Sequence, residues 1–525
     1  MESDNSYSQN YQNYIQTILN QAASGVNESI QDVLEATNWD EPQSWLDCNN
    51  LAVIALVMAE QSDESQMRTL YLEMALEALN EGAAAHPLCA AHLALVHCMI
   101  GQSQEAMRLA FSKFVETSQV AFTAKSDTIG LVYLPMDKHN RAIARRELLQ
   151  IMLQADTGYT QAILLLGDVL RRSQLVFYNA GGLRFLQLTN HLIPNSAWLN
   201  LSLGLASLFS NQWEGLAYLY RAHAIAPNYA PAVQALYLTY RALNQQNLAD
   251  GWLKAAQAYY REQPESLEWQ WANLLSDQLF TYVPFDHNVL LAVEANFRSI
   301  VTSVMLVEGD WFEAEMEFWR EQLQPGMTVI DVGANVGVYT FSAAQQVGKT
   351  GRVLAVEPFS GCVQCMEETR RVNDLSQVTI CAGAASDCDS TIRISLHRAS
   401  ELNEVITDDS APASGNVEEV PCYTLDTLVE QEKLDQVDWL KIDAEGHEMQ
   451  VLKGSDRLLN HHKPGILYEN IAAAKGSNTE VAAYLQSKGY QLFCYQPFVR
   501  QLMPISTDKE LTGNLNIIAL PAEKV

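Results

Sequence analysis

Basic side chains are scarce in this 525-residue chain. It has 33 Lys and Arg against 62 Asp and Glu, which gives a formal net charge of -29 at pH 7. A field of this sign repels the phosphate backbone of nucleic acids and the anionic surface of membranes. The composition therefore argues against nucleic acid and membrane as partners.

Long apolar runs and paired cysteines are also missing. The longest apolar stretch, residues 51–59, is too short to cross a bilayer. The polar, acidic beginning of the chain, residues 1–14, has neither the basic nor the apolar region of a secretory signal. Nine cysteines, an odd number in a large chain, predict free thiols and no disulfide framework. We therefore expect a cytoplasmic protein, long enough for at least two domains.

The residues from about 13 to 275 follow a helical pattern, and two blocks within them are similar. Gly182 and Gly215 lie 33 residues apart, and each precedes a proline by twelve residues, Pro194 and Pro227. A small residue where two helices touch, and a proline that ends the second one, are typical of stacked helical hairpins. The pattern indicates a helical repeat.

These blocks resemble the tetratricopeptide repeat, whose late alanine and terminal proline correspond to Ala222 and Pro227. The resemblance is good over residues 158–265 and weak over 40–115, and residues 115–137 look like an irregular interruption. A non-repetitive helical bundle is the alternative. We predict a helical-repeat binding domain over residues 1–275, able to recruit a protein partner, and a second domain over residues 276–525.

The second domain has a different texture. Short β-rich runs alternate with helical ones, at residues 328–332, 353–356, 378–382, 437–442 and 466–468. This alternation is typical of a parallel sheet covered by helices. The last two runs, residues 490–495 and 516–520, have no helix between them and can close the sheet as an antiparallel pair. The predicted fold class is all-α followed by a doubly wound α/β sheet.

The first β-rich run leads through a glycine loop into a helix. The loop contains Asp331, Gly333, Ala334, Asn335 and Gly337. A strand, a glycine turn and a helix in this order form the nucleoside loop of doubly wound folds. Asp331 would repel a pyrophosphate but suits the cationic end of a sulfonium cofactor. A different nucleotide enzyme and a plain strand–turn–helix are the alternatives.

Two further strand ends carry polar side chains. Glu357 ends the second run, 26 residues after Asp331, where an acidic residue can accept hydrogen bonds from ribose hydroxyls. Ser386 and Asp387 follow the third run and can contact the adenine amine. A turn that begins with Ser-Asp explains the second pair almost as well.

The most specific motif surrounds the end of the fourth run. Lys441 lies inside a strand where a central parallel position is normally apolar, so it implies a carboxylate partner, and Asp443 shares its face. Asp443, Glu445 and His447 follow at the carboxyl edge of the sheet, where such folds bind ligands. Together they are a candidate acid–base centre. Helix-capping acids beside a surface histidine are the alternative.

In order and spacing these motifs resemble the FkbM-type methyltransferases, over about residues 285–522. The likeness includes Leu306, Gly309, Glu313 and, at a later strand end, Glu469. It implies a class I methyltransferase fold with a seven-stranded sheet and an acceptor facing Asp443, Glu445 and His447. It also implies that S-adenosyl-L-methionine is bound by Asp331, Gly333, Ala334, Asn335, Gly337, Glu357, Ser386 and Asp387.

Two residues depart from the family pattern: Trp439, in a strand where smaller aliphatics are usual, and Asn470. Asp443, Glu469 and Asn470 also resemble the oxygen-ligand set of Mg²⁺-dependent methyltransferases, although we expect no metal. The expected reaction is methyl transfer to a hydroxyl of a glycan or secondary metabolite. N-methylation of an asparagine side chain in a protein or peptide recruited by the repeats is the second hypothesis. A catalytically silent helical-repeat adaptor is the third.

Overall fold

The computed structural model describes residues 2–19, 27–121, 128–136, 141–173, 180–274, 279–286, 288–396, 404–405, 416–470 and 477–524. The chain divides into two compact units. One contains residues 1–236 with 496–500, and the other contains residues 237–495 with 501–525. The elements between residues 237 and 275 group with the second unit, and the domain boundary after residue 275 stays a prediction.

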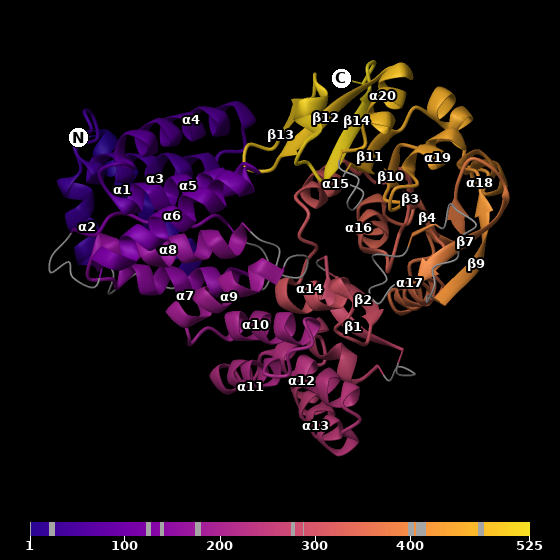
Figure 1. The fold of residues 1–525 in the computed structure, drawn as a ribbon, viewed down its shortest axis with the longest axis horizontal. Coiled ribbons are helices and arrows are strands. Elements are labelled where there is room, and N and C mark those ends of the chain that lie inside the picture. Colours follow the sequence, from indigo (N-terminus) through magenta and orange to yellow (C-terminus); the bar gives the residue numbers. More distant parts are fainter. Residues whose placement is uncertain are drawn as a thin grey trace. The chain divides into compact units, whose positions relative to one another are not determined.

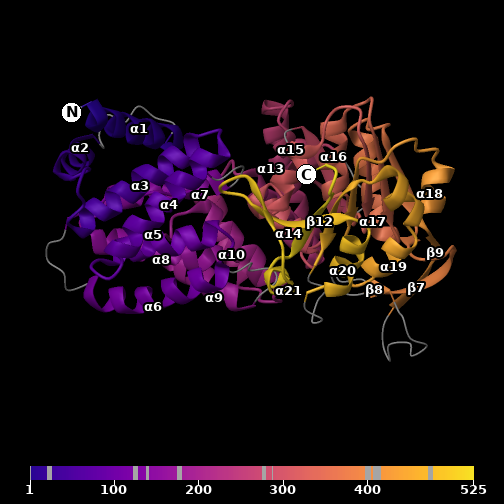
Figure 2. The ribbon, with the colours of Figure 1, turned by 90° about the horizontal axis from the view of Figure 1, so that it is seen from above.

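The first unit is built from helices (Figure 1). Helices α3, α4, α5, α6 and α8 pack side by side, as both ribbon views show (Figures 1 and 2). The helices from the start of the chain to the boundary between the units are α1 (Glu2–Leu19), α2 (Asn27–Ala36), α3 (Trp45–Gln61), α4 (Ser65–Gly82), α5 (Pro87–Met99), α6 (Ser103–Ala121), α7 (Arg141–Leu153), α8 (Gly158–Arg172), α9 (Ala180–Leu192), α10 (Ala197–Phe209), α11 (Gly215–Ile225) and α12 (Ala230–Ala242).

Local signals set where several of these helices begin. Ser44 caps α3 and exchanges hydrogen bonds with Asp47 in a capping box. The hydroxyls of Thr157 and Ser196 cap α8 and α10 by accepting from backbone N–H groups three residues further on. Pro87 opens α5, at a position where a helix does not need the missing N–H.

The packing of α10 on α11 depends on two glycines. A Cβ atom on Gly215 would lie 2.5 Å from the carbonyl oxygen of Gly204, and one on Gly204 would lie 3.0 Å from that of Gly215. The small residue expected where two helices touch is therefore present at Gly215. The two backbones therefore pack more closely than they could if either residue had a side chain.

One segment of the first unit is neither helix nor strand and nevertheless lies in its interior. Residues 128–136 have no regular secondary structure, and Leu131, Val132, Tyr133 and Leu134 are each at most 2% exposed. The sequence predicted an irregular interruption over residues 115–137. This was wrong for its first part, because α6 continues to Ala121. Nor did the sequence predict that the interruption is buried among the helices.

The second unit begins with helices and a hairpin. A 3-10 helix, η1 (Leu267–Ala272), follows α13 (Gln246–Glu262), and β1 (Phe280–Phe285) pairs antiparallel with β2 (Val289–Glu294). Two helices then lead to the main sheet, α14 (Ile300–Glu308) and α15 (Glu315–Gln322).

An eight-stranded sheet forms the centre of the second unit, in the order β13-β12-β14-β11-β10-β3-β4-β5. The labels in Figure 1 follow this order from β13 to β4. Strands β5, β4, β3, β10 and β11 are parallel, and β14 runs antiparallel to β11 and β12. The predicted antiparallel closure is confirmed. The sheet has eight strands and not the seven that the family resemblance implied, because β13 is added at its edge. The strands are β3 (Thr328–Val332), β4 (Arg352–Glu357), β5 (Val378–Ala382), β10 (Trp439–Ile442), β11 (Gly465–Glu469), β12 (Tyr490–Gln496), β13 (Gln501–Pro504) and β14 (Asn516–Pro521).

The direction of the chain across the sheet reverses between β3 and β10. Connections after β3 and β4 move one way, and those after β10 and β11 move the other way, so the helices in them cover opposite faces. Open α/β sheets bind ligands beside such a switch point, at the carboxyl ends of the strands. The fold thus places the ends of β3 and β10 at the centre of the candidate site.

The helices around this sheet are α16 (Val338–Val347), α17 (Ser360–Val372), α18 (Leu425–Gln431), α19 (Glu448–Lys453), the π-helix η3 (Leu458–His462), α20 (Thr479–Ser487) and α21 (Asp508–Leu511). Leu428, Val451 and Leu485, from three of them, pack in one core with Leu440 and Ile466 of the sheet. No helix within the described ranges is both long and apolar enough to cross a membrane.

A second, smaller sheet was not expected from the sequence. It has the order β6-β9-β7-β8 and consists of β6 (Ala384–Ala385), β7 (Ser390–Leu396), β8 (Glu404–Val405) and β9 (Asn416–Tyr423). It has a small core of its own around Ile394, Val420 and Cys422. The sheet follows β5, so it lies next in sequence to Ser386 and Asp387.

Trp439 departs from the family pattern, but its large ring fits into the sheet because the residue paired with it on the neighbouring strand is a glycine. Gly465 is its register partner on β11, and a Cβ atom there would lie 2.6 Å from the Trp439 ring. Phe318 and Trp319 of α15 pack against the same ring, edge to face, with centroids 5.6 and 6.1 Å away. The large side chain thus joins α15 to the sheet.

Candidate active site

The glycine loop after β3 lies directly against the end of β10. Gly333 and Gly337 have φ angles of 71° and 93°, and Asn335 has a φ angle of 51°. A Cβ atom on Gly333 would lie 1.7 Å from the carbonyl oxygen of Asp443. Both the backbone conformation and the contact therefore require glycine at position 333. Ala334, between the glycines, is buried.

Asp331 lies beneath this loop with its carboxylate only half satisfied. The residue is 1% exposed, and its Oδ2 accepts a hydrogen bond of 2.6 Å from the Thr340 hydroxyl. Its Oδ1 is buried and has no hydrogen-bond partner among the described residues. Burial raises the pKa of Asp331, and the nearby Lys441 ammonium opposes this rise. A donor, and above all a cationic one, would satisfy the free oxygen.

Glu357 ends β4 and holds the neighbouring backbone. Its two carboxylate oxygens accept hydrogen bonds of 2.8 Å from the backbone N–H groups of Asn335 and Phe359. The side chain is 6% exposed, and its burial raises the pKa of Glu357 to about 7. Each oxygen keeps a second lone pair for a further donor.

His447 contacts Ser386, so the structure joins two predicted motifs that lie 61 residues apart. The His447 Nε2 and the Ser386 Oγ are 2.8 Å from each other, and both residues are buried, whereas Asp387 is exposed. Burial lowers the pKa of His447, and the Asp387 charge opposes this. The imidazole is therefore neutral at pH 7. Gly454 allows the approach, because a Cβ atom there would lie 2.0 Å from the Ser386 carbonyl oxygen.

Lys441 has the carboxylate partner that its position in a central strand predicted. Its Nζ lies 2.8 Å from the Asp443 Oδ2 and 4.4 Å from the centre of the Tyr339 ring. The residue is 2% exposed. Burial alone would lower the pKa of Lys441, but the carboxylates of Asp443, Glu313 and Asp331 raise it above the ordinary value. The ammonium therefore stays charged.

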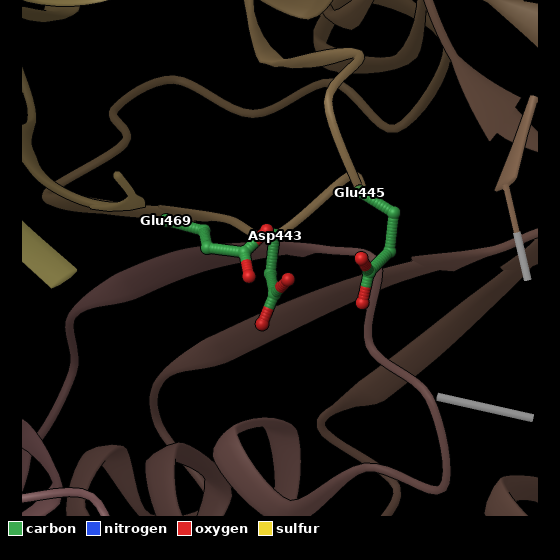
Figure 3. Close-up of side chains that lie close together, drawn as sticks. All are labelled: Asp443, Glu445 and Glu469. Atoms are coloured by element: carbon green, nitrogen blue, oxygen red, sulfur yellow. The ribbon is translucent and has the colours of Figure 1, made fainter. Parts of the chain in front are cut away.

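Three carboxylates gather at the ends of β10 and β11. The side chains of Asp443, Glu445 and Glu469 point toward one another (Figure 3), with oxygen atoms all within 4.8 Å. Burial, together with the charges of Asp443 and Glu445, raises the pKa of Glu469 to about 11. Glu469 is therefore protonated at pH 7, and it can donate as well as accept a hydrogen bond.

The turn that carries Glu445 is strained. Glu445 has a φ angle of 49°, and Gly446 follows with 89°. The Glu448 Oε1 accepts hydrogen bonds of 3.1 and 3.0 Å from the backbone N–H groups of Ala444 and Gly446. Non-glycine residues in this region cost energy and are found mainly at functional sites. The hydrogen bonds of Glu448 hold the turn in place.

Asn470 is not free to act as a metal ligand, contrary to the resemblance noted in the sequence. It is fully buried, and its amide nitrogen donates to the carbonyl oxygens of Leu511 and Asn514. Its amide oxygen accepts from the backbone N–H of Asn478. Its amide group is thus fully occupied by hydrogen bonds to backbone groups, two of them next to α21. In the structure Glu445 takes the third place beside Asp443 and Glu469.

Sequence reasoning missed a second layer of polar residues beneath the site. The Tyr339 hydroxyl donates to the Glu313 Oε2 at 2.5 Å, and the Asn516 amide donates to the same oxygen at 3.0 Å. Burial raises the pKa of Glu313, and burial and the charge of Glu313 raise that of Glu315 to about 7. Glu313 was noted only for its family likeness. Asn516 lies 203 residues away, where no local signal points to it.

The site as a whole carries more negative than positive charge. The buried Lys441 ammonium faces Asp331, Glu313 and Asp443. A cation would balance the remaining charge, and both a sulfonium compound and a divalent metal ion have the right sign. The free Asp331 oxygen, next to the glycine loop, favours an organic cation with N–H donors.

The parallel sheet with its switch point, the glycine loop after β3 and the acidic end of β4 define a doubly wound α/β protein of the nucleoside-binding class. Residues 331–492 match the family model of the methyltransferase FkbM domain. The second unit thus contains a methyltransferase domain of the FkbM type. No curated protein sequence is significantly similar to the chain.

Several solved structures are similar to part of the chain. The methyltransferase FkbM from Methylobacillus flagellatus KT is 18% identical over 42% of this chain and 52% of its own, with a TM-score of 0.26. A SAM-dependent methyltransferase from Aquifex aeolicus is 17% identical over 40% of this chain and 89% of its own, with a TM-score of 0.23. The M. jannaschii TYW2 in complex with AdoMet is 14% identical over 47% of this chain and 86% of its own, with a TM-score of 0.24. The chain spans about half of the Methylobacillus protein.

Proposed function

We propose that this chain is an S-adenosyl-L-methionine-dependent methyltransferase that methylates a hydroxyl group of a glycan or secondary metabolite. One observation carries the proposal: the glycine loop within the FkbM match touches the carboxylate-bearing end of β10, with Gly333 against Asp443. A nucleoside-binding loop and a cluster of proton acceptors thus meet at the switch point of the sheet.

The residues present fit the cofactor. Asp331 offers a buried, unpartnered oxygen to the cationic methionine end, and Glu357 ends β4 where ribose hydroxyls bind in such folds. Asn335, Ser386 and Asp387 complete the predicted cofactor side. When bound, the cofactor supplies a methyl group on a sulfonium, which is already a good leaving group.

The acceptor side is rich in hydrogen-bond acceptors. Asp443 and Glu445 can hold hydroxyl donors, and the protonated Glu469 can donate to a neighbouring acceptor oxygen. Alignment of the acceptor oxygen with the methyl group contributes most of the rate enhancement. A base is needed only when the hydroxyl must lose its proton. Asp443, Glu445 and His447 are the candidates for that role.

The helical unit supports a second candidate function. We propose that its helix pairs α8–α9 and α10–α11 are tetratricopeptide-like repeats. Pro194 and Pro227 follow the second helix of each pair, 33 residues apart, and Gly215 lies where α10 and α11 touch. Such an array can recruit a protein, which favours N-methylation of an asparagine side chain as the alternative. An inactive adaptor is the third reading, which the intact Asp331, Glu357 and Asp443 oppose.

The experiment that tests the proposal uses the purified full-length chain with S-adenosylmethionine whose methyl group is isotopically labelled. Glycans, small metabolites and proteins of a lysate are then separated and searched for the labelled methyl group. We expect the label on a glycan or metabolite oxygen. Label on an asparagine amide would support the alternative, and no label in any fraction, with intact cofactor binding, would support the adaptor.

A further inference from the structure

The buried segment 128–136 of the first unit is held by hydrogen bonds to its main chain as well as by the burial of its side chains. Loops normally run over the surface, because a buried loop leaves backbone polar groups without partners. Here side chains from the surrounding helices take the place of a neighbouring strand. The segment therefore has the geometry of a peptide bound in a groove.

One edge of the segment faces α3, α5 and α8. The Gln161 amide pairs with both the N–H and the carbonyl oxygen of Gly130, at 2.9 and 3.0 Å. Asn49 donates to the Leu131 carbonyl oxygen and Asn50 accepts from the Leu131 N–H, both at 2.9 Å. Gln161, Asn49 and Asn50 are at most 1% exposed.

His92 completes this edge as a neutral acceptor. Its Nε2 accepts from the Tyr133 N–H at 3.1 Å, and its Nδ1 lies 2.9 Å from the Asn49 Oδ1. Burial lowers the pKa of His92 to about 3. A proton on Nδ1 satisfies both contacts, so the ring also holds the Asn49 amide in its orientation.

The other edge faces α1. The Tyr11 hydroxyl donates to the Val132 carbonyl oxygen and accepts from the Val132 N–H, at 2.9 and 3.0 Å. The Tyr14 hydroxyl makes the same pair of hydrogen bonds with Leu134, at 2.8 and 2.7 Å. Two hydroxyls thus satisfy two residues that alternate along the segment, as a paired strand would.

These contacts bind the main chain, and the side chains are restricted at Gly130 and at Tyr133, whose fully buried ring stacks on Tyr14 with the ring centroids 5.8 Å apart. A Cβ atom on Gly130 would lie 2.8 Å from the Asn49 Nδ2 and 2.9 Å from a methyl group of Leu88. The four residues that follow are apolar and buried. The groove therefore suits an extended peptide with a glycine followed by apolar residues.

We propose that the groove between α1 and helices α3, α5 and α8 is a peptide-binding site, and that residues 128–136 are an exchangeable internal ligand of it. An extended apolar peptide of a partner protein takes the place of this segment. The internal copy keeps the site closed at a high effective concentration until such a peptide arrives.

Hydrogen exchange of the full-length protein tests whether the segment leaves the groove. We expect the amides of Leu131, Val132, Tyr133 and Leu134 to exchange at least ~10-fold faster than the core amides of α5 and α8, through a local opening. Exchange of these four amides only together with α5 and α8, in global unfolding, would mean that the segment is a permanent part of the core and would overturn the proposal.

Binding in trans is tested with a fluorescent synthetic peptide that has the sequence of residues 128–136. The L134D variant weakens the internal copy, and we expect it to bind the peptide at least ~10-fold more tightly than the wild type. The matched control is L70D, the same substitution at an exposed leucine, which should bind like the wild type. A peptide with valine in place of the glycine should bind L134D at least ~10-fold more weakly than the original.

The variant remains informative if it does not fold alone. The peptide should then restore its cooperative thermal transition, because a ligand of the native state stabilises that state. A folded L134D that does not bind the peptide, or an unfolded L134D that the peptide does not restore, would overturn the proposal.

Discussion

Asp331 and Lys441 are register partners on β3 and β10, and they define the charge of the candidate site. Lys441 is bonded to Asp443, which leaves one oxygen of Asp331 without a partner. An unpaired buried carboxylate oxygen is costly unless a ligand completes it. At the residue scale the site is therefore built for a cation that the folded chain does not itself supply.

The first prediction concerns this oxygen. Asp331→Ala should weaken the binding of S-adenosylhomocysteine to the full-length chain by about 1.5–3 kcal/mol, the scale of a lost charge-assisted hydrogen bond. Isothermal titration calorimetry measures the change. Thr340→Val, which removes the hydrogen bond to the other oxygen but keeps the carboxylate, is the control and should have a smaller effect. Affinity like that of the wild type in Asp331→Ala would remove Asp331 from the site.

Glu357 should make cofactor binding depend on pH. Its pKa is raised to about 7 in the folded protein, so the carboxyl is protonated below this pH. Ribose hydroxyls donate to a carboxylate better than to a carboxylic acid, so binding below the pKa must release a proton. Affinity for S-adenosylhomocysteine should therefore fall between about pH 8 and pH 6, by at most ~10-fold per unit. Calorimetry on Glu357→Gln should show a flatter profile, and equal slopes in both proteins would contradict the assignment.

His447 is the third residue to test. Its imidazole is neutral and contacts Ser386. The ring can therefore take up the proton of the acceptor hydroxyl at neutral pH. We expect His447→Ala to reduce turnover ~100-fold, with the affinity for S-adenosylhomocysteine nearly unchanged. Ser386→Ala removes the hydroxyl that contacts the imidazole but keeps the imidazole itself, so it should reduce turnover less than His447→Ala. Unchanged turnover in His447→Ala would make the histidine structural and Asp443 the better candidate for the base.

At the scale of elements, the sequence predicted strands better than it predicted their surroundings. Strands β3 and β5 have the predicted bounds because a buried parallel strand is a short apolar run between turns. The small sheet was missed because β6 and β8 have only two residues each, and because the adjacent Glu418 and Glu419 and then Pro421 interrupt the apolar–polar alternation of β9. The contact of Gly333 with Asp443 joins residues 110 positions apart, and no local pattern reveals such a distance.

The carboxylates at the ends of the neighbouring strands β10 and β11 lead to a prediction about metals. Lys441 already neutralises Asp443, and Glu469 is protonated at pH 7, so the cluster needs less charge compensation than three ionised carboxylates would. We expect methyl transfer to continue at full rate in excess EDTA, measured with the labelled cofactor. Loss of activity that Mg²⁺ restores would show a metal site of the kind that oxygen ligands favour.

At the scale of the whole molecule, the sequence predicted a helical region followed by a doubly wound sheet, and the structure has both. It did not predict the burial of residues 128–136. Their hydrogen-bond partners lie up to 121 residues away, and a sequence pattern shows only neighbours along one element. The grouping of α13 and η1 with the second unit likewise rests on contacts that no local pattern shows.

The role of the helical unit is tested by truncation. A chain that begins at residue 237 keeps α13 and η1 with the sheet. We expect it to bind S-adenosylhomocysteine like the full-length chain but to lose most of its kcat/KM for the native acceptor. Unchanged kcat/KM after truncation would assign the helices to assembly instead of recognition.

The net charge of -29 leads to a separate expectation about salt. The association of the full-length chain with a protein acceptor should weaken as the salt concentration rises if the acceptor surface is basic.

The hydrogen bonds of residues 128–136 also bear on how the first unit folds. An array of helical repeats, each touching only the next, can gain and lose its ends one repeat at a time. Here Tyr11 and Tyr14 are joined to Val132 and Leu134 over 121 and 120 positions, and Asn49 is joined to Leu131 over 82. Bringing such distant residues together costs conformational entropy before their hydrogen bonds form, and this slows folding. The N-terminal helices should therefore acquire their native structure together, as one cooperative transition, and not as a sequence of independent repeats.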